Sequence, residues 1–400
     1  MTNSFRILMV APTSFFLDYG CHVRILEEAR ALQRLGNQVT IVTYYLGRDL
    51  PALDIVRTRP TPWHSDYEVG SSLHKIAFDL FLAWTGVKTV LGRDFDIIHG
   101  HLHEGALIGY LLSRIKGLPL VADFQGSMTS EMVDHHFLDA DGIWYHWVRL
   151  LEWRISHLPH AILTSTQMTA LLLERDFDCD EKRVHPLPDC VNLDFFHPGV
   201  LDRETVFERR ATLGIPPGRP VVAYLGLLAD YQGTPHLLRA AHRLKQRGVA
   251  FHLLIMGFPS VELYRQMAVD LGVADCVTFT GKVPYEEAPA HLALGDIAVA
   301  PKLSPTEGAG KILNYMAMEL PTVAFATPIS REYLGNLGTY AAPVGDAAAL
   351  ASAIGHLLEE PDCWRDLGRK LRERAGQHFS WDRSGRQLLE LYRSVSDRAG

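Results

Sequence analysis

Residues 304–325, SPTEGAGKILNYMAMELPTVAF, contain in order a glycine turn, a short amphipathic helix, a proline and an apolar strand. Gly308 and Gly310 allow the backbone to approach a ligand closely. The helix that begins near Lys311 presents unpaired N–H groups and the positive end of its dipole, which together bind anions such as phosphate. Pro321 marks the end of the helix. The stretch therefore predicts a helix-to-strand unit of an α/β sheet, with an anion site at its start.

The same helix predicts which side chains face a ligand. Three apolar residues are expected to face the core: Ile312, Leu313 and Met316. By three- and four-residue spacing, Lys311, Asn314 and Tyr315 fall on another face. A tight turn between a strand and a helix also explains the glycines, but it does not explain why Glu307 clusters with Lys311 and Asn314. We therefore interpret the segment as a ligand site.

Outward from this stretch, short apolar runs alternate with helical patterns along the chain. The runs of the second half are PVVAYLG, FHLLIMG, CVTFTG, DIAVAP and PTVAFAT. The first half has its own series, FRILMVAP, QVTIVTYY, FDIIHGHL, PLVADFQG and HAILTST. This alternation is typical of parallel sheets covered by helices. The sequence therefore predicts two doubly wound α/β domains.

Proline and glycine are dense between the two series. Around residues 186–220 the sequence changes to PLPDCVNLDFFHPG and then LGIPPGRP, as is typical of a boundary between compact units. The expected N-terminal domain, second domain and final helix are residues 1–195, 196–378 and 379–400. The final helix has Leu388, Leu389 and Tyr392 at helical spacing and is expected to pack toward the N-terminal domain.

Composition argues against several classes of protein. The net charge is −7 and no dense basic stretch occurs, so we do not expect nucleic acid as a partner. No apolar run approaches the roughly 20 residues that span a bilayer. The run FRILMVAP has no basic segment before it and no cleavage site, so we expect no secretory signal. The five cysteines are scattered, which favours reduced thiols in a cytoplasmic protein.

Loops beyond the carboxyl ends of the strands bind the ligands of open α/β sheets, so two such domains predict a cleft between facing loops. After the first strand, APTSFFLDYGC reaches Gly20 before a helix begins, and it offers N–H groups to an anion. In the second domain, Gly226 and Gly233 bracket the loop of AYLGLLADYQG. These two glycines serve either the cleft or packing.

Three histidines alternate in HGHLHEG at the end of a strand: His99, His101 and His103. They would point to one side if the strand continued. Metal ligation is one interpretation, but the segment runs into a glycine turn and supplies no paired acid ligand. We favour histidines that hydrogen-bond in the cleft, and we expect no metal.

Two stretches, residues 74–90 and 143–155, combine aromatic residues with lysine and arginine. Their tryptophans are Trp84, Trp144, Trp147 and Trp153. Such helix faces can rest on a membrane surface. Core helices wrapped around the sheet are the simpler interpretation, and peripheral contact with the inner face of a membrane is the alternative.

Taken together, these loops resemble those of the retaining GT-B glycosyltransferases of family 4, the glycosyl-transferase group 1 proteins. The segments that carry the resemblance, in the family's order, are DYGCHVRILEEARALQRLGNQVTIV, the His-rich strand end, LPDCVNLDFFHP, YLGLLADYQG, GKVPYEEAPAHLALGDIAVAP, the stretch quoted first and FSWDRSGRQLLELY. The resemblance implies a GT-B fold of two Rossmann-like domains that face a cleft. It further implies a nucleotide sugar in the second domain, an acceptor in the first, and transfer that keeps the anomeric configuration without metal or cofactor.

The resemblance also implies roles for single residues. It places the phosphates of the donor at Gly20, Gly308, Gly310 and Lys311. Glu307 would contact the donor sugar, Asn314 would lie by the ribose, and Val283 in the loop of residues 281–284 would lie by the base. The residues that would orient the acceptor or the sugar are Gln125, His101 and His103.

The chain departs from the family's usual pattern at Leu227, Gln232, Asn314 and Gln125, the last of which stands where the family has a histidine. Leu227 and Gln232 replace a basic pair that grips the diphosphate. Asn314 replaces an acid, although its amide can still hydrogen-bond a ribose hydroxyl. We expect Lys302 and Lys311 to supply the missing charges.

The sequence therefore predicts a retaining glycosyltransferase that moves a sugar from a nucleotide sugar to a hydroxyl of a glycan, a lipid or a small molecule. Lys311, Lys302, Gly20 and helix-end N–H groups are expected to stabilise the leaving diphosphate. One alternative is a binding module that has lost catalysis together with the basic pair. A sugar-nucleotide epimerase is another alternative, which the family-4 segments match less well.

Overall fold

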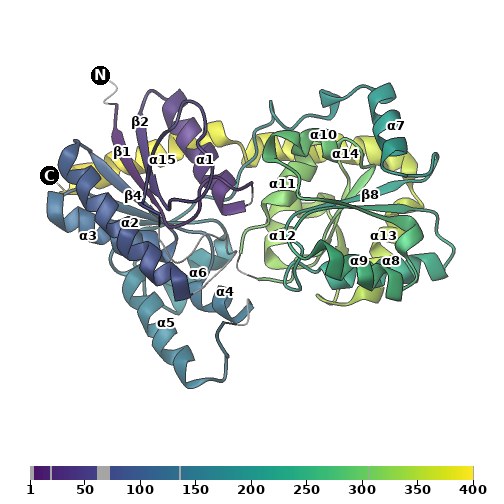
Figure 1. Ribbon diagram of the computed structural model, residues 1–400, viewed down its shortest axis with the longest axis horizontal. Helices are drawn as coiled ribbons and strands as arrows, with labels where there is room; N and C mark the ends of the chain where they lie inside the picture. The colour runs from purple at the N-terminus through teal and green to yellow at the C-terminus, as the bar shows by residue number, and fades with distance from the viewer. Residues whose placement is uncertain (1–3, 19, 61–72, 135–136, 306, 400) are drawn as a thin grey trace. The chain divides into compact units, whose positions relative to one another are not determined.

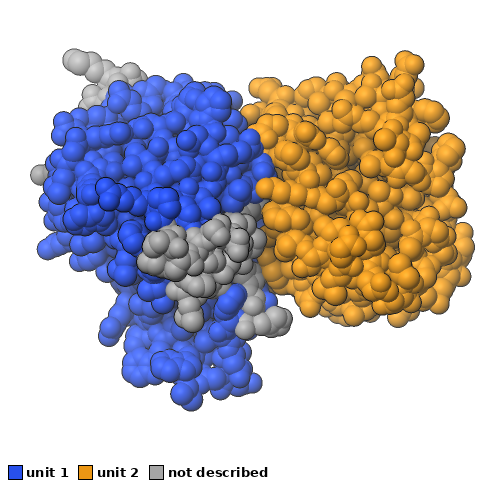
Figure 2. Space-filling model, in the orientation of Figure 1, with its two compact units in different colours: residues 1–189, 306–308, 381–400 blue, residues 190–305, 309–380 orange. Residues whose placement is uncertain are grey.

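The structure is a computed structural model that describes residues 4–18, 20–60, 73–134, 137–305 and 307–399. Two compact units are distinguished by colour in Figure 2. Unit 1 comprises the described residues of 1–189, 307–308 and 381–399, and unit 2 comprises 190–305 and 309–380. The sequence had placed the domain boundaries at residues 195 and 378.

In the part of unit 1 that the structure describes, a seven-stranded parallel sheet has the order β3-β2-β1-β4-β5-β6-β7. Figure 1 labels β1, β2 and β4 of this sheet. Its strands are β1 (Arg6–Ala11), β2 (Gln38–Thr43), β3 (Asp54–Arg57), β4 (Ile97–His101), β5 (Leu120–Phe124), β6 (Ala161–Thr164) and β7 (Val184–Pro186). β1 pairs with β2 on one side and with β4 on the other. The strand order therefore reverses between β1 and β4, and this switch point is where doubly wound sheets bind ligands.

Helices of unit 1 cover this sheet. They are α1 (Gly20–Arg34), α2 (Leu73–Gly92), α3 (Leu102–Lys116), α4 (Met128–Asp134), α5 (Ile143–Ser156), α6 (Gln167–Arg175) and α15 (Trp381–Ala399). Phe78 and Leu82 on α2 pack in one apolar cluster with Val10 on β1. Ile155 on α5 packs in another with Ala122 on β5. Burial of these apolar faces against the sheet holds the helices in place.

In the described part of unit 2, a six-stranded parallel sheet has the order β10-β9-β8-β11-β12-β13. Its strands are β8 (Val221–Leu225), β9 (His252–Met256), β10 (Val277–Gly281), β11 (Ile297–Ala300), β12 (Thr322–Phe325) and β13 (Thr339–Ala341). β8 pairs with β9 and with β11. The switch point of this sheet therefore lies between β8 and β11.

The α-helices of unit 2 are α7 (Arg203–Thr212), α8 (Thr234–Gln246), α9 (Val261–Asp270), α10 (Ala288–Leu292), α11 (Gly310–Ala317), α12 (Pro328–Leu334), α13 (Ala347–Leu358) and α14 (Trp364–His378). Short 3₁₀ turns are Pro198–Val200, Ala274–Cys276, Tyr285–Glu287, Gly335–Leu337 and Pro361–Cys363. Leu237 and Leu238 on α8 and Leu350 on α13 are fully or almost fully buried in one cluster with β8 and β11 residues.

The prediction of two Rossmann-like, doubly wound parallel sheets is confirmed. The final helix, α15, belongs to unit 1 and packs on α1, where Tyr392 is fully buried. None of the helices in the described ranges is both long enough and apolar enough to cross a bilayer.

The interpretation of residues 74–90 and 143–155 as core helices is wrong for most of their tryptophans. α2 and α5 form as expected, yet Trp84 is 60% exposed, and Trp144 and Trp147 are 67% and 65% exposed. Each helix packs on the core with another of its faces. The prediction failed because helical periodicity shows that a helix has an apolar stripe but does not show whether the protein buries that stripe.

Candidate functional site

The candidate site in unit 2 lies beyond the carboxyl ends of β8 and β11. The loop of residues 226–233 follows β8, and the segment that follows β11 leads into α11 at Gly310. Because β8 and β11 are adjacent and parallel, the two loops lie at the same edge of the sheet. This edge is the switch point of unit 2, so the fold places Leu227, Gln232 and Lys311 where such sheets bind ligands.

Lys311, on the first turn of α11, reaches back to the end of β8. Its Nζ donates to Gln232 Oε1 at 2.9 Å and to the Tyr224 hydroxyl at 3.1 Å. The same nitrogen lies 4.3 Å from the centre of the Tyr224 ring, a cation–π distance. Tyr224 was missed by the sequence analysis, because it stands inside an apolar strand run that predicts only burial.

The surroundings of Lys311 contain no counter-ion among the described residues, and its two partners are neutral. Burial, and then the nearby charge of Lys302, lower the pKa of Lys311 well below its ordinary value. A desolvated ammonium gains most from an anion brought close to it. The group is therefore placed to accept a negatively charged ligand such as a diphosphate.

Glycines shape the space around this lysine. At Gly226, φ is +150°, and a Cβ built there would lie 2.6 Å from Lys311 Nζ. At Gly233, φ is +80°, and a Cβ would overlap the carbonyl oxygen of Pro301. Gly226 therefore leaves room for the ammonium, whereas Gly233 lets the loop after β8 pack on the residue that follows β11.

The two residues that stand where the resemblance leads us to expect a basic pair act in different ways. Gln232 is buried and holds Lys311 by its side-chain oxygen. Leu227 contributes its backbone, since its carbonyl oxygen accepts the Tyr224 hydroxyl at 2.6 Å. The side chain of Lys302 is also buried beside this edge. Lys311 is thus held by an amide and a phenol, with the second lysine of the site, Lys302, nearby.

α11 differs from the expectation at one residue. Tyr315 is fully buried, and its hydroxyl accepts the N–H of Leu225 at 2.8 Å, so the expectation that it shares the ligand face is wrong. This hydrogen bond joins α11 to the end of β8.

Asn314 is half-buried and makes no side-chain hydrogen bond with the described residues. Val283, just beyond β10, is half-buried at the same edge of the sheet.

In unit 1, the switch point between β1 and β4 contains a buried arginine. Arg24 on α1 donates to both oxygens of Asp123, each at 2.8 Å, and to Asp189 at 3.0 Å. Burial raises the pKa of Asp123, but the charge of Arg24 and the hydrogen bond with His101 outweigh it, so the pKa lies well below the ordinary value. The sequence analysis missed this pair because 99 residues separate its members.

Two of the three predicted histidines meet at this arginine. His99 and His101 stack with ring centres 4.3 Å apart, and His101 Nδ1 lies 3.3 Å from Asp123 Oδ2. His99 Nδ1 pairs with the Tyr392 hydroxyl of α15 at 2.6 Å. Burial, and then the neighbouring His101, lower the pKa of His99 well below its ordinary value.

His103 does not join this stack, because β4 ends at His101 and α3 begins at Leu102. Its ring stacks on Phe124 at 4.3 Å, and its Nε2 lies 3.6 Å from Glu152. Burial lowers the pKa of His103. The geometry therefore makes His103 a packing residue of α3 rather than a neighbour of His101.

Metal-type ligands come together once in the described ranges, at Glu28, His99, His101 and Asp123, all buried, with one ligand atom of each within 4.8 Å of the others. Both oxygens of Asp123 already accept from Arg24, whose Nε also lies 3.2 Å from Glu28. A guanidinium cation thus stands beside these carboxylates. The group is better described as a buried ion network than as a metal centre.

Gln125, Glu307 and Gly308 belong to the same unit as this network. Gln125 Nε2 lies 3.4 Å from Asp123 Oδ2. A Cβ built at Gly126 would lie 3.2 Å from Glu307 Cγ. At Gly308, a Cβ would overlap Asp189. Unit 1 thus brings three predicted residues, Gln125, Glu307 and His101, close to the Arg24 network. Gly20 is the first residue of α1, and no atom lies within 4 Å of the position that a Cβ would take there.

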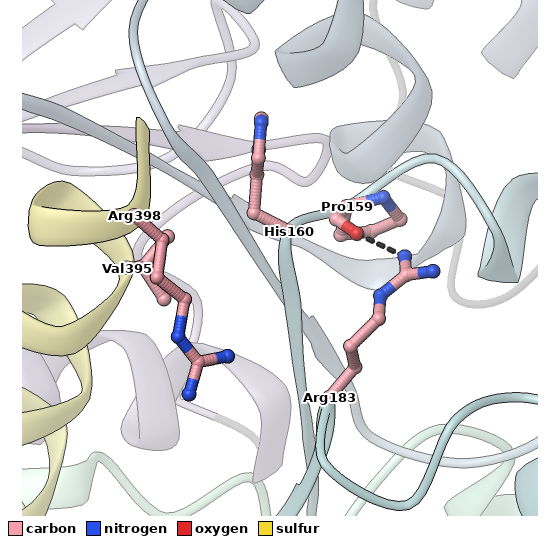
Figure 3. Close-up of a pocket in the computed structure, with 5 residues that line it drawn as sticks. All are labelled: Pro159, His160, Arg183, Val395 and Arg398. Atoms are coloured by element: carbon pink, nitrogen blue, oxygen red, sulfur yellow. Dashed lines mark hydrogen bonds between the residues drawn. The ribbon is translucent and has the colours of Figure 1, made fainter. Parts of the chain in front are cut away.

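A cavity of about 330 Å³ lies elsewhere in unit 1, as Figure 3 shows. Its lining residues are Pro159, His160, Arg183, Val395 and Arg398. Arg183 is held by the carbonyl oxygen of Pro159 (Figure 3). Pro159 and His160 precede β6 and Arg183 precedes β7, so the cavity lies at the amino ends of these strands. Within unit 1, this is the edge of the sheet opposite the carboxyl ends of β4 and β5, where His101 and Asp123 lie.

Comparison with known proteins identifies a family for each half of the chain. The family described as Glycosyl transferases group 1 matches residues 219–360, and Glycosyltransferase Family 4 matches residues 20–195. The D-inositol 3-phosphate glycosyltransferase of Corynebacterium efficiens is 28% identical over 398 residues, which cover 93% of this chain and 90% of that protein.

Two solved structures are similar over nearly the whole chain. Sucrose-phosphate synthase from Thermosynechococcus elongatus has a TM-score of 0.82 at 19% identity, covering 98% of this chain and 100% of that one. Anabaena Alr3699/HepE in complex with UDP-glucose has a TM-score of 0.77 at 15% identity, covering 98% and 100%. With both domains matched by sequence and the fold by structure, the chain belongs to the family-4, group 1 glycosyltransferases of GT-B fold.

Proposed function

We propose that this glycosyltransferase transfers a sugar from a nucleotide sugar to an acceptor hydroxyl with retention of the anomeric configuration. The observation that carries the proposal is Lys311, a desolvated ammonium held by the neutral Gln232 and Tyr224 at the switch point of unit 2. The related Anabaena structure contains UDP-glucose, which supports a nucleotide sugar as the donor.

In this mechanism the diphosphate leaves from unit 2. Negative charge grows on it as the bond to the sugar breaks, and Lys311, Lys302 and the N–H groups at the start of α11 stabilise that charge. Asn314 offers its amide to the ribose, and Val283 borders the base. The proposal needs no resident metal or cofactor, because the protein's own cations and helix end face the departing group.

Unit 1 supplies the groups that orient sugar and acceptor. In this proposal Glu307 contacts the donor sugar, and Gly20 lies beside open space that the donor can enter. Gly308 packs closely on Asp189, and Gln125 and His101 orient the acceptor hydroxyl beside Asp123. The hydroxyl attacks the face of the sugar from which the diphosphate departs, and the phosphate takes its proton. His103 contributes only packing against Phe124 in this proposal.

For the acceptor, the name of the Corynebacterium relative suggests a first choice. That relative is a D-inositol 3-phosphate glycosyltransferase, so we propose a polyol or its phosphate as the first acceptor to test. Glycans and lipid-linked hydroxyls come next. No disulfide bond joins the five cysteines, all of which lie in the described ranges, and this supports a reducing, cytoplasmic location.

The second candidate function is a sugar-nucleotide-binding module without catalysis. Leu227 and Gln232, which stand at the family's basic positions, favour it because neither can neutralise a diphosphate. Release of the nucleoside diphosphate from any nucleotide sugar above the uncatalysed rate would exclude it.

The experiment that tests the proposed function follows product formation. Purified protein is incubated with UDP-, GDP-, ADP- and dTDP-sugars and with inositol phosphate or simple polyols, and the anomeric configuration of the product is read by NMR. We expect one donor to react with retention, and Glu307→Gln to lower kcat while that donor still binds. Full turnover by Glu307→Gln, or an inverted product, would contradict the proposal.

A further inference from the structure

The cavity of about 330 Å³ at the amino ends of β6 and β7 has no role in the proposed function. Its volume is at the lower end of the range for small-molecule sites. Its lining residues, drawn in Figure 3, come from three parts of the chain: Pro159 and His160 precede β6, Arg183 precedes β7, and Val395 and Arg398 lie near the end of α15. A ligand in this cavity would therefore contact separate elements of unit 1 at once.

The charge of the lining is positive. None of the five lining residues is an acid. Arg398 is exposed and forms no hydrogen bond or ion pair with the described residues. Arg183 is half-buried, and its Nη2 donates to the carbonyl oxygens of His157, at 3.2 Å, and Pro159. Its Nε and Nη1 donate to no atom in the described ranges. Both guanidinium groups therefore keep donors for a ligand.

His160 adds a third donor group in a fixed position. Its backbone N–H donates to the carbonyl oxygen of Leu120 at 2.9 Å, and its Nδ1 accepts the N–H of Leu120 at 3.0 Å. The proton of the neutral ring is therefore on Nε2, which has no partner among the described residues. The ring thus presents an N–H donor beside the two arginines.

Like charges are crowded at this edge of the sheet. Partial burial, and then the charge of Arg183, lower the pKa of His160. Partial burial, and then the charge of Arg398, lower the pKa of His185 on β7. Each arginine is thus close enough to a histidine to disfavour its protonation. An anion in the cavity would relieve this repulsion.

We infer that this cavity binds the phosphate group of a small phosphate ester. A phosphate offers three oxygens to the donors of Arg183, Arg398 and His160, and it forms bidentate pairs with guanidinium groups. A carboxylate has only two oxygens for the same three groups. Pro159 and Val395, both buried, form an apolar wall for the organic part of the ester.

The bound phosphate joins the end of α15 to the start of β7. α15 is the segment by which the chain returns to unit 1 after unit 2. Charge-assisted hydrogen bonds from Arg398 and Arg183 to one phosphate therefore strengthen the attachment of this helix to unit 1. The inference does not rest on the proposed function, because it requires neither a nucleotide sugar nor an acceptor.

Hydrogen–deuterium exchange of the full chain, followed by mass spectrometry, tests the inference because it locates protection along the sequence. The probes are inorganic phosphate and glycerol 3-phosphate, and the controls are glycerol and potassium chloride at equal ionic strength. We expect both phosphates, and neither control, to slow exchange in the last two turns of α15 and in the segment that leads into β7. Glycerol 3-phosphate should act at a concentration no higher than that of inorganic phosphate.

A variant of α15 shows whether the cavity is responsible. Arg398→Met should raise the concentration of glycerol 3-phosphate that gives half-maximal protection at least about tenfold, because it removes charge-assisted hydrogen bonds. Arg393→Met, at an exposed arginine of the same helix outside the cavity, is the matched control and should respond like the wild type. Arg398 has no hydrogen-bond partner among the described residues, so its variant should keep the wild-type unfolding temperature, which excludes misfolding.

Each remaining outcome decides against the inference. Equal protection of Arg398→Met and the wild type would overturn it, as would a wild type that neither phosphate protects or that potassium chloride protects equally. Protection by inorganic phosphate alone would show that the cavity does not admit an ester. Protection confined to the start of α11, and lost in Lys311→Met, would place the phosphate in the candidate donor site instead. Sugar transfer by Arg398→Met, expected at the wild-type rate, separates these failures from failure of the proposed function.

Discussion

The ammonium of Lys311 and the side-chain oxygen of Gln232 are 2.9 Å apart, so an amide holds the cation that begins α11. The amide orients the cation without neutralising it. A carboxylate at position 232 would instead form an ion pair that a phosphate must break. Gln232 therefore keeps Lys311 positioned and still available to an anionic ligand.

Lys311→Met should weaken binding of the donor. A charge-assisted hydrogen bond to a phosphate contributes about 1.5 to 3 kcal/mol, so affinity should fall roughly tenfold to a hundredfold. Isothermal titration calorimetry with the nucleotide sugar measures the change. Lys370→Met, at an exposed lysine of unit 2, is the matched control. Equal affinities for Lys311→Met and its control would remove Lys311 from the donor site.

Binding of the donor should also take up protons at a pH between the pKa of Lys311 in the free protein and its pKa in the complex. Burial and Lys302 lower the pKa of Lys311 in the free protein, and a bound diphosphate raises it again. Affinity should therefore be highest below the free-state pKa and fall as the pH rises from that pKa toward the bound-state value. Calorimetry in two buffers with different ionisation enthalpies counts the protons. If binding takes up no protons at any pH, or if Lys311→Met takes up as many protons as the wild type, the uptake does not come from Lys311.

Removing the buried arginine should destabilise unit 1 strongly. Arg24→Met would leave Asp123 buried without its cation, and breaking such a pair costs about 3 to 5 kcal/mol. Arg34→Met, which breaks an exposed pair between the same helix and Asp382, should cost about 1 kcal/mol or less. Urea unfolding followed by circular dichroism compares them. Similar losses of stability in the two variants would show that the buried pair is not special.

Gly233→Ala should separate steric overlap from backbone strain. Gly233 and Gly248 both have positive φ, at +80° and +71°, but only Gly233 would place a Cβ against the Pro301 carbonyl. Gly248→Ala should cost about 1 kcal/mol of stability for the backbone alone. Gly233→Ala should cost clearly more in the same thermal unfolding experiment. Equal costs would mean that the loop after β8 shifts freely away from Pro301.

Sequence patterns were sufficient for the sheets and for part of the site. Apolar runs and helical spacing predicted both parallel sheets, and the glycine turn before Lys311 predicted the start of α11. The prediction for Tyr315 was wrong because this residue, at the border of two helix faces, turns inward, where the backbone N–H of Leu225 donates to its hydroxyl. The roles of the site residues in catalysis stay predictions.

Other features could not be read from local patterns. Arg24 and Asp123 are 99 residues apart, so only the sheet order β1-β4-β5 brings them together. Trp144 and Trp147 follow the spacing of a core helix, and spacing cannot tell a stripe that the protein buries from one that it exposes.

The most direct test of the central claim is a calorimetric titration of wild type and Lys311→Met with UDP-, GDP-, ADP- and dTDP-sugars. We predict that one of these donors binds the wild type at a single site and binds Lys311→Met at least about tenfold more weakly. If no donor binds the wild type, or if the preferred donor binds both proteins equally, the edge of unit 2 between β8 and β11 is not the donor site.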